Sequence, residues 1–416
     1  MSEKIPDFSK ERKFNDERWK RQASSRGLFS KEKTPEDFMR SEAKRDDEDF
    51  EKKYIRESKR EYEIWEEHCK PIRQAFLEQA RNPEGVDFVT VNIFMQGGMR
   101  AAGIAGAALG QDLLGVNSDT VDYAVGISSG DTVATRFVGG REQLLRGIAM
   151  LTGPLADKKF IDIRFGNTID INYIKKLEEE GEYALDEERI KNAHCKLWTV
   201  VTEPLKGSAE PAVRILDKKN IKEGMSTASV STMSIPKVTG DIPTIDGVTY
   251  YDGGFAALPI KEIIAKVKSE NPEKKVKVLI FTQASFDAME NIKPERWEAV
   301  AEKIMRSIAG PLRGVGSLDS AAIVQQLAKG LVLKENLRTS LDAIEKETDA
   351  NIGVVWAPPT NLGMMSIDSD EMKMAVAEST RQFIRLSGGE QPDEIPEYVS
   401  VRDRLKHSIR DYGRAA

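Results

Sequence analysis

The sequence has little cysteine and little histidine: two and three residues, respectively, in a chain of 416. Cys69 and Cys195 are far apart and lie in different kinds of sequence, which favours free thiols in a reducing cytoplasm over a disulfide framework. No Cys/His cluster has the spacing of metal ligands, so we expect no metal site. With only three imidazole groups, the chain also offers few of the general bases that enzymes use most often.

Long apolar runs are missing as well. No stretch of about eighteen apolar residues occurs, so the sequence predicts no membrane-spanning helix. The first residues, "MSEKIPDFSKERK", contain no apolar segment, and we expect no Sec signal peptide there. The net charge of -6 gives no general attraction to nucleic acid or anionic membranes. We therefore expect a cytoplasmic protein without a nucleic-acid partner, while peripheral membrane contact and secretion by a route other than Sec stay open.

The composition divides the chain into three parts. Residues 1–84 form an arm of which roughly half is charged, with few apolar side chains other than aromatic ones. Such a segment buries little surface by itself, so we expect it to be helical or partly disordered. The alternative is a docking arm whose aromatic side chains contact a partner, the rest of the chain or a membrane surface. Within it, residues 64–82 predict a helix interrupted near Pro71, and residues 389–416 are expected to form a peripheral tail.

Residues 85–388 alternate between strand-like and helix-like patterns, and 40% hydrophobic residues in the chain suffice for a core. We expect strands at 86–95, 121–127, 194–204, 211–217, 274–284 and 351–359, and a strand, turn and helix over 250–273. Further helices are expected at 100–115, 129–140, 141–153, 295–310, 317–347 (one long helix or two) and 370–388. This alternation predicts an α/β fold with a mostly parallel central sheet and helices on both faces.

Three glycine-containing sites follow predicted strands, and the first is "YAVGISSGDTVA". Ser128 lies between Gly126 and Gly130 in the spacing G-x-S-x-G. A serine at a strand-to-helix turn projects its hydroxyl above the sheet, and flanking glycines avoid clashes in so tight a turn. The N-terminus of the next helix lowers the energy of negative charge nearby. The alternative is a loop serine that only caps the helix.

The second site is "MQGGMRAAGIAG", where Gly97 and Gly98 follow a strand and precede a helix. Backbone N–H groups in such a loop can converge on an anion. The anion is either a nucleotide phosphate or the oxyanion of an acyl-transfer intermediate. The loop lacks the G-x-G-x-x-G spacing and the Walker lysine of nucleotide sites. A plain strand–helix turn is the third interpretation.

The third site is "TYYDGGFAALPI", in which Asp252 precedes Gly253 and Gly254. An aspartate at the carboxyl edge of a parallel sheet points into the crevice where ligands bind. The alternative is that Asp-Gly-Gly is only a turn signal.

The histidines leave Ser128 without an obvious base. In the chain order usual for α/β-hydrolases the histidine follows the acid, and only His407, in the tail, follows Asp252. His194 precedes a predicted buried strand, and His68 lies in the charged arm. The economical interpretation is that Asp252 is itself the base, which gives a Ser-Asp dyad.

These motifs, in this order, resemble the patatin family of lipid acyl hydrolases. Its pattern is G-G-G-x-R/K-G, then G-x-S-x-G, then D-G-G or D-G-A. The chain is similar at "QGGMRA", with Gly97, Gly98 and Arg100 in register, at "GISSG" with Ser128, and at "DGG" with Asp252. The stretch "MSTASVSTMSIP" resembles the family's A-S-x-A-x-P segment. The resemblance implies a three-layer α/β/α patatin-like domain over residues 85–388.

The resemblance also implies a mechanism without metal or cofactor. Asp252 accepts the proton of Ser128, and Ser128 attacks the carbonyl of a fatty-acyl ester to form an acyl-enzyme. Phospholipids, lysophospholipids, glycolipids and neutral glycerides all fit as substrates. The oxyanion hole is assigned to the loop residues Gly97, Gly98, Met99 and Arg100, the last of which orders the loop.

The sequence departs from the family pattern at four positions. Gln96 and Ala101 replace glycines of the oxyanion loop, and Ser129 and Asp131 stand where the family commonly has small residues. The charge of Asp131 is favourable near a helix N-terminus, but it can also oppose the oxyanion. Two alternatives therefore stay open: a catalytically degenerate, patatin-fold binding protein, and a Ser-His-Asp esterase that uses His407 on small soluble esters.

Overall fold

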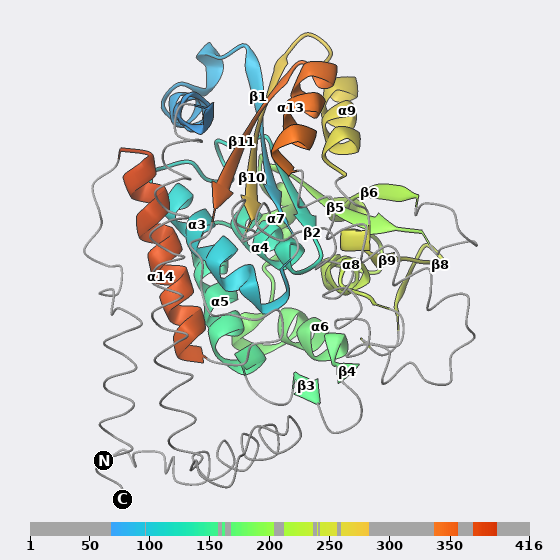
Figure 1. Cartoon of the computed structure of the whole chain (residues 1–416). Coiled ribbons are helices and arrows are strands. Elements are labelled where there is room, and N and C mark those ends of the chain that lie inside the picture. Colours follow the sequence, from blue (N-terminus) through green and yellow to red (C-terminus); the bar gives the residue numbers. More distant parts are fainter. Residues whose placement is uncertain are drawn as a thin grey trace, which may run out of the picture. The chain divides into compact units, whose positions relative to one another are not determined.

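The structure is a computed structural model that describes residues 68–95, 97–156, 160–162, 168–203, 212–235, 239, 242–255, 259–282, 337–356 and 369–388 (Figure 1). The charged segment 1–67, the predicted helix at 295–310 and the tail 389–416 lie outside these residues, as does the first part of the predicted helix at 317–347.

A mostly parallel sheet of seven strands forms the centre of the described chain. Its order is β11-β10-β1-β2-β5-β6, and β9 also pairs with β5. All neighbouring pairs are parallel except β5–β6 and β5–β9. The strands are β1 (Phe88–Phe94), β2 (Tyr123–Ile127), β5 (Lys196–Thr202), β6 (Val213–Asp217), β9 (Tyr251–Asp252), β10 (Lys275–Thr282) and β11 (Ala350–Trp356). The predicted α/β character and mostly parallel sheet are therefore confirmed.

Short elements complete the described fold. Two hairpin-like pairs lie outside the main sheet: β3 (Ile161–Asp162) with β4 (Thr168–Ile169), and β7 (Thr244–Ile245) with β8 (Val248–Thr249). The 3-10 helices are η1 (Pro83–Gly85), η2 (Gly98–Arg100), η3 (Pro154–Ala156), η5 (Gly181–Tyr183), η6 (Lys218–Asn220) and η7 (Gly253–Phe255).

Helices pack on both faces of the sheet, because alternate side chains of each buried strand point to opposite faces. Phe94 and Phe281, whose ring centroids are 4.8 Å apart, belong to one core, and Ile93 and Ile280 belong to the other. The first core is shared with α3 (Ala101–Leu113), α4 (Ser129–Val138), α5 (Arg141–Thr152), α6 (Ile171–Glu179), α7 (Glu187–Asn192), α8 (Met225–Thr232) and α14 (Ser369–Leu386). The second is shared with α9 (Ile260–Glu270) and α13 (Leu337–Thr348).

The helix over residues 68–81 packs against the sheet and does not belong with the charged arm. Ile72 and Phe76 are buried in the first core. The Arg73 guanidinium donates to the carbonyl of Leu386 at 3.1 Å. The helix continues through Pro71, so the predicted interruption at that residue is wrong. Residues 68–81 therefore contribute to the same core as the sheet.

Helix α3 owes its close contact with α14 to glycine. A Cβ added to Gly106 would lie 2.2 Å from the carbonyl oxygen of Val376, and one added to Gly110 would lie 2.8 Å from that of Thr380. The Thr380 hydroxyl donates to the carbonyl of Gly106 at 2.9 Å, which joins the two helices directly. Because α3 follows the Gly97–Gly98 loop, this contact also fixes the helix that carries that loop.

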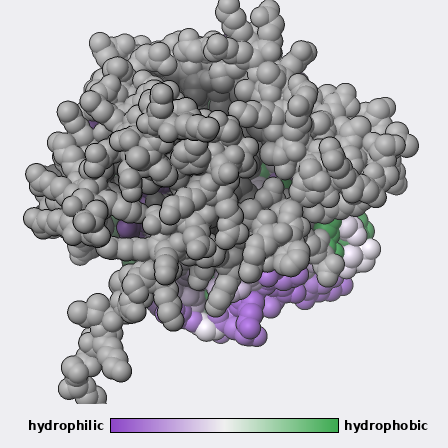
Figure 2. All heavy atoms as spheres, turned by 60° about the horizontal axis from the view of Figure 1, so that its bottom comes forward, coloured by the Kyte–Doolittle hydropathy of each residue, from purple (hydrophilic) through white to green (hydrophobic). Residues whose placement is uncertain are grey.

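The described surface is mainly polar. On the face drawn in Figure 2, the visible described residues are mostly hydrophilic, with a smaller hydrophobic area beside them. Among the described residues, the large hydrophobic side chains that are exposed are Leu145 and Val248. No helix in the described part of the chain is both long and apolar enough to cross a bilayer.

Substituting Gly106 by alanine tests the α3–α14 contact. In an open helix this change would stabilise the protein by up to about 1 kcal/mol through helix propensity. Here the added methyl group meets backbone, so we expect the free energy of unfolding to fall by about 1–3 kcal/mol. Chemical denaturation monitored by circular dichroism measures this difference, and a stabilised variant would contradict the close packing.

Candidate active site

Ser128 occupies a sharp turn between β2 and α4. Its backbone is in a strained region, with φ 53° and ψ -133°, which costs on the order of 1–3 kcal/mol for a residue other than glycine. The two motif glycines make the turn possible. A Cβ on Gly126 would lie 2.3 Å from the Cα of Asp131, and one on Gly130 would lie 2.2 Å from the carbonyl oxygen of Phe94. The predicted strand–turn–helix context of the G-x-S-x-G motif is therefore present.

The register of the sheet brings Asp252 beside Ser128. Ile127, the last residue of β2, pairs with Val200 of β5. Asp252 of β9 pairs with the next residue, Val201, in the antiparallel direction. The two strands thus follow one another along the same edge of β5. The Ser128 hydroxyl donates to Oδ2 of Asp252 at 2.8 Å.

Asp252 is held by its backbone and by neutral donors. Its N–H donates to the carbonyl of Ser234 at 2.8 Å, and the Thr202 hydroxyl donates to its carbonyl at 3.1 Å. The N–H of Gly254 donates to Oδ1 at 2.7 Å. Gly253 is required by close packing, since a Cβ there would lie 2.2 Å from the carbonyl oxygen of Val200. The D-G-G motif therefore orients the carboxylate toward the serine.

Burial makes Asp252 a stronger base than an ordinary aspartate. Only 7% of the residue is exposed. Burial raises the pKa of Asp252 from 3.8 to about 6, although hydrogen bonds from Gly254 and Ser128 oppose the rise. Above pH 6 the group is mainly a carboxylate, and it then accepts a proton more readily than a solvated aspartate does.

Thr232, the last residue of α8, supports the nucleophile turn through hydrogen bonds of its hydroxyl group. Its hydroxyl accepts the N–H of Ser128 at 3.0 Å and donates to the carbonyl of Val200 at 2.5 Å. Helix α8 has the sequence MSTASVST, and all eight of its residues are buried. Small hydroxyl side chains can satisfy buried backbone groups where larger apolar ones cannot.

The glycine-rich loop lies beside the nucleophile turn. The N–H of Gly97 donates to the Ser129 hydroxyl at 3.1 Å. Gly98 has φ 58° and begins η2, which Met99 and Arg100 continue. The first N–H groups of such a helix have no partner within it, so those of Gly98 and Met99 are free of intrahelical bonds. Burial lowers the pKa of the Arg100 guanidinium.

Asp131, the acidic departure in the nucleophile helix, is fully buried and paired. Its carboxylate accepts from the Lys218 ammonium, and it accepts from the Thr199 hydroxyl at 2.5 Å. Its backbone N–H donates to the carbonyl of Ser128 at 2.9 Å. The carboxylate is therefore not an uncompensated charge.

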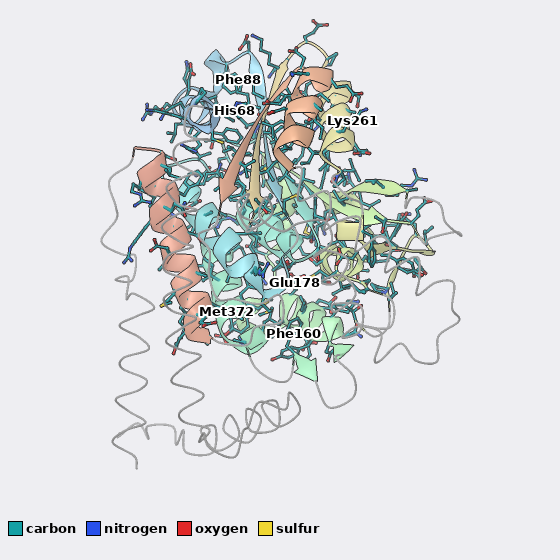
Figure 3. The ribbon with its side chains drawn as sticks, in the orientation of Figure 1. His68, Phe88, Phe160, Glu178, Lys261 and Met372 are labelled. Atoms are coloured by element: carbon teal, nitrogen blue, oxygen red, sulfur yellow. The ribbon has the colours of Figure 1, made fainter. Side chains whose placement is uncertain are left out.

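Two of the three histidines lie away from the dyad. Nε2 of His194 is 3.5 Å from Oδ1 of Asp122, which precedes β2, whereas Ser128 follows the opposite end of that strand. Nε2 of His68 is 3.0 Å from the carbonyl oxygen of Ile352, and Figure 3 labels it on the helix over residues 68–81. His407 lies outside the described residues.

Comparison with known proteins adds no relative: no protein-family model matches the chain, and no curated protein is similar to it in sequence. In the part of the chain that the structure describes, no group of three or more His, Cys, Asp or Glu residues could hold a metal ion.

Replacing Asp252 by asparagine should stabilise the protein at neutral pH. A pKa raised from 3.8 to about 6 means that the folded state loses stability as pH rises through this window, a cost of about 3 kcal/mol above pH 7. Asparagine avoids this cost and can keep both hydrogen bonds. We expect the variant to unfold at higher denaturant than wild type at pH 8, and the difference to vanish at pH 4. Asp246→Asn, at an exposed residue, is the control, and an equal gain at both pH values would contradict the burial argument.

Replacing Thr232 by valine tests the support of the nucleophile turn. Valine keeps the shape but leaves the buried N–H of Ser128 without its acceptor, a loss of about 1–3 kcal/mol in the free energy of unfolding. We also expect a fluorophosphonate probe to label Ser128 at least tenfold more slowly. Thr227→Val is the matched control, because the Thr227 hydroxyl donates to the carbonyl of Glu223, four residues earlier in the chain. Equal behaviour of the two variants would rule out the assigned role.

Proposed function

We propose that the protein is a carboxylic ester hydrolase of the patatin-like phospholipase type, acting on lipid acyl esters through a Ser-Asp dyad. The observation that carries this proposal is the hydrogen bond of 2.8 Å from the Ser128 hydroxyl to the buried carboxylate of Asp252. The mostly parallel sheet supports the three-layer α/β/α patatin-like architecture that the motifs imply.

The proposed first step is nucleophilic attack. Asp252 accepts the proton of Ser128 as its oxygen bonds to the ester carbonyl carbon, and the carbonyl oxygen becomes an oxyanion. When the intermediate collapses, the bond to the alcohol breaks and Asp252 returns the proton to the leaving oxygen. In the second half Asp252 takes a proton from water, whose oxygen attacks the acyl-enzyme. The fatty acid leaves, and Ser128 regains its proton. Side chains and water suffice for each step.

The proposed oxyanion hole is the loop at the start of α3. The N–H groups of Gly98 and Met99, at the first turn of η2, are the donors we assign to the oxyanion. The N–H of Gly97 already donates to the Ser129 hydroxyl and so joins the loop to the nucleophile turn. Arg100 orders the loop at the point where η2 passes into α3.

The same proposal extends to the class of substrate and to the location of the protein. The motifs favour a fatty-acyl ester, with peripheral contact to a lipid surface, over a nucleic acid or a nucleotide. Cys69 and Cys195 are both buried and form no disulfide, which agrees with the proposed cytoplasmic location. The charged arm is then a candidate for contact with a partner or a lipid surface.

Ester hydrolysis and covalent labelling test the proposal together. We expect purified protein to hydrolyse p-nitrophenyl butyrate, with a rate that rises with pH through about 6 as Asp252 ionises, and to be labelled at Ser128 by a fluorophosphonate. Ser128→Ala should lose both activities, and Asp252→Asn should lose at least a thousandfold in turnover, as removal of a dyad member does.

Two controls separate the alternatives. A Ser-His-Asp esterase would lose turnover in His407→Ala, whereas the dyad should not respond to that change. A binding protein without activity would show neither hydrolysis nor labelling, and wild-type turnover equal to that of Ser128→Ala would end the assignment. A panel of phospholipid, lysophospholipid, glycolipid and glyceride vesicles or micelles then identifies the substrate class.

A further inference from the structure

A buried ion pair lies at the first turn of α4, directly after the nucleophile turn. Asp131, three residues after Ser128, pairs with Lys218 of η6, and the side chains of both are fully buried. The Lys218 ammonium also donates to the hydroxyls of Thr135 and Ser229, at 2.6 Å each. All three protons of the ammonium therefore have acceptors, so the buried group is fully hydrogen-bonded.

Lys218 connects the two helices that hold the dyad. Its acceptors on α4 are Asp131 and Thr135, and its acceptor on α8 is Ser229. Helix α8 then holds the nucleophile turn through the Thr232 hydroxyl, and the residue two positions after the helix, Ser234, accepts the N–H of Asp252. A single ammonium group thus links α4, which begins at the nucleophile, to the helix that supports both members of the dyad.

Lys218 also balances the charge near the developing oxyanion. Without it, the carboxylate of Asp131 would stand one helical turn from the nucleophile with only the Thr199 hydroxyl as partner. Other ionisable groups interact with this cluster: Glu178 of α6, which Figure 3 labels, and Arg136 of α4. Burial raises the pKa of Glu178, while Lys218 and Arg136 oppose the rise.

We propose that Lys218 is a positioning residue of the hydrolase: it fixes α4 against α8 so that Ser128 and Asp252 stay in contact, and it neutralises Asp131 below the oxyanion. The inference rests on the proposed function. It also accounts for the aspartate that stands where the patatin pattern has a small residue. Lys218 touches neither substrate nor reacting atoms, so its effect must reach the reaction through the dyad.

Three variants separate the two roles of Lys218, which are to link α4 to α8 and to balance the charge of Asp131. They are Lys218→Met, Asp131→Asn and the double variant Asp131→Asn/Lys218→Met. Lys218→Met should lower kcat for p-nitrophenyl butyrate by about 10- to 100-fold, with KM little changed, because a small displacement of the dyad slows the reaction strongly. The double variant should recover the thermal midpoint, but kcat should stay about tenfold below wild type.

Arg141→Met is the matched control. It removes the cation beside Asp112, whose side chain is only 4% exposed, at a site outside the network around the dyad. It should lower the thermal midpoint and leave kcat unchanged. Asp131→Asn should lower kcat less than Lys218→Met does, because it keeps the ammonium group that links α4 to α8.

The outcomes decide between the two proposals. An inactive, unlabelled wild type would refute the hydrolase itself. With an active wild type, a folded Lys218→Met variant with unchanged kcat would overturn only the role of Lys218. If Lys218→Met does not fold, the double variant decides: wild-type kcat would refute the bridge, and a lowered kcat would support it.

Discussion

The pairing of strand β5 is the constraint on which the rest of the site depends. Along one edge, β5 pairs first with the nucleophile strand in parallel and then, from the next residue, with the short strand of the acid in the antiparallel direction. Ser128 and Asp252 therefore meet because of backbone register, and no long side chain has to reach across a gap. The strained backbone of Ser128 persists because Gly126, Gly130 and Thr232 let the neighbouring chain close around it.

Two buried carboxylates near the nucleophile, those of Asp252 and Asp131, have different kinds of partner. Asp252 receives hydrogen bonds from neutral groups, the N–H of Gly254 and the hydroxyl of Ser128, so burial keeps its pKa high. Asp131 has a cation, Lys218, at its side. If these partners were exchanged, Asp252 would be held as a weak base and Asp131 would carry an unbalanced charge beside the oxyanion. The placement of one ammonium group thus separates a carboxylate suited to proton transfer from one suited to structure.

The strands, the α4 turn and the positions of the glycine motifs could be predicted because each depends on local patterns: β-branched runs, Gly-x-Ser-x-Gly and Asp-Gly-Gly. The supporting groups could not be predicted in the same way. Lys218 is 87 residues from Asp131, and Thr232 is 104 residues from Ser128, so only the three-dimensional fold shows that they meet. The Ser/Thr-rich run MSTASVST was the one available signal for α8, because a buried helix of such composition must satisfy polar neighbours. The break expected at Pro71 is wrong because the packing of residues 68–81 against the sheet outweighs the local preference of proline.

The departures from the patatin pattern bear on whether the site works. Each polar departure after the nucleophile has a compensating partner: the Ser129 hydroxyl accepts the N–H of Gly97, and Asp131 is paired with Lys218. A buried lysine is costly unless its charge is matched, so Lys218 and Asp131 each make the other tolerable. This mutual dependence keeps the turn intact around the contact between Ser128 and Asp252, which is what the proposed hydrolase requires of its support.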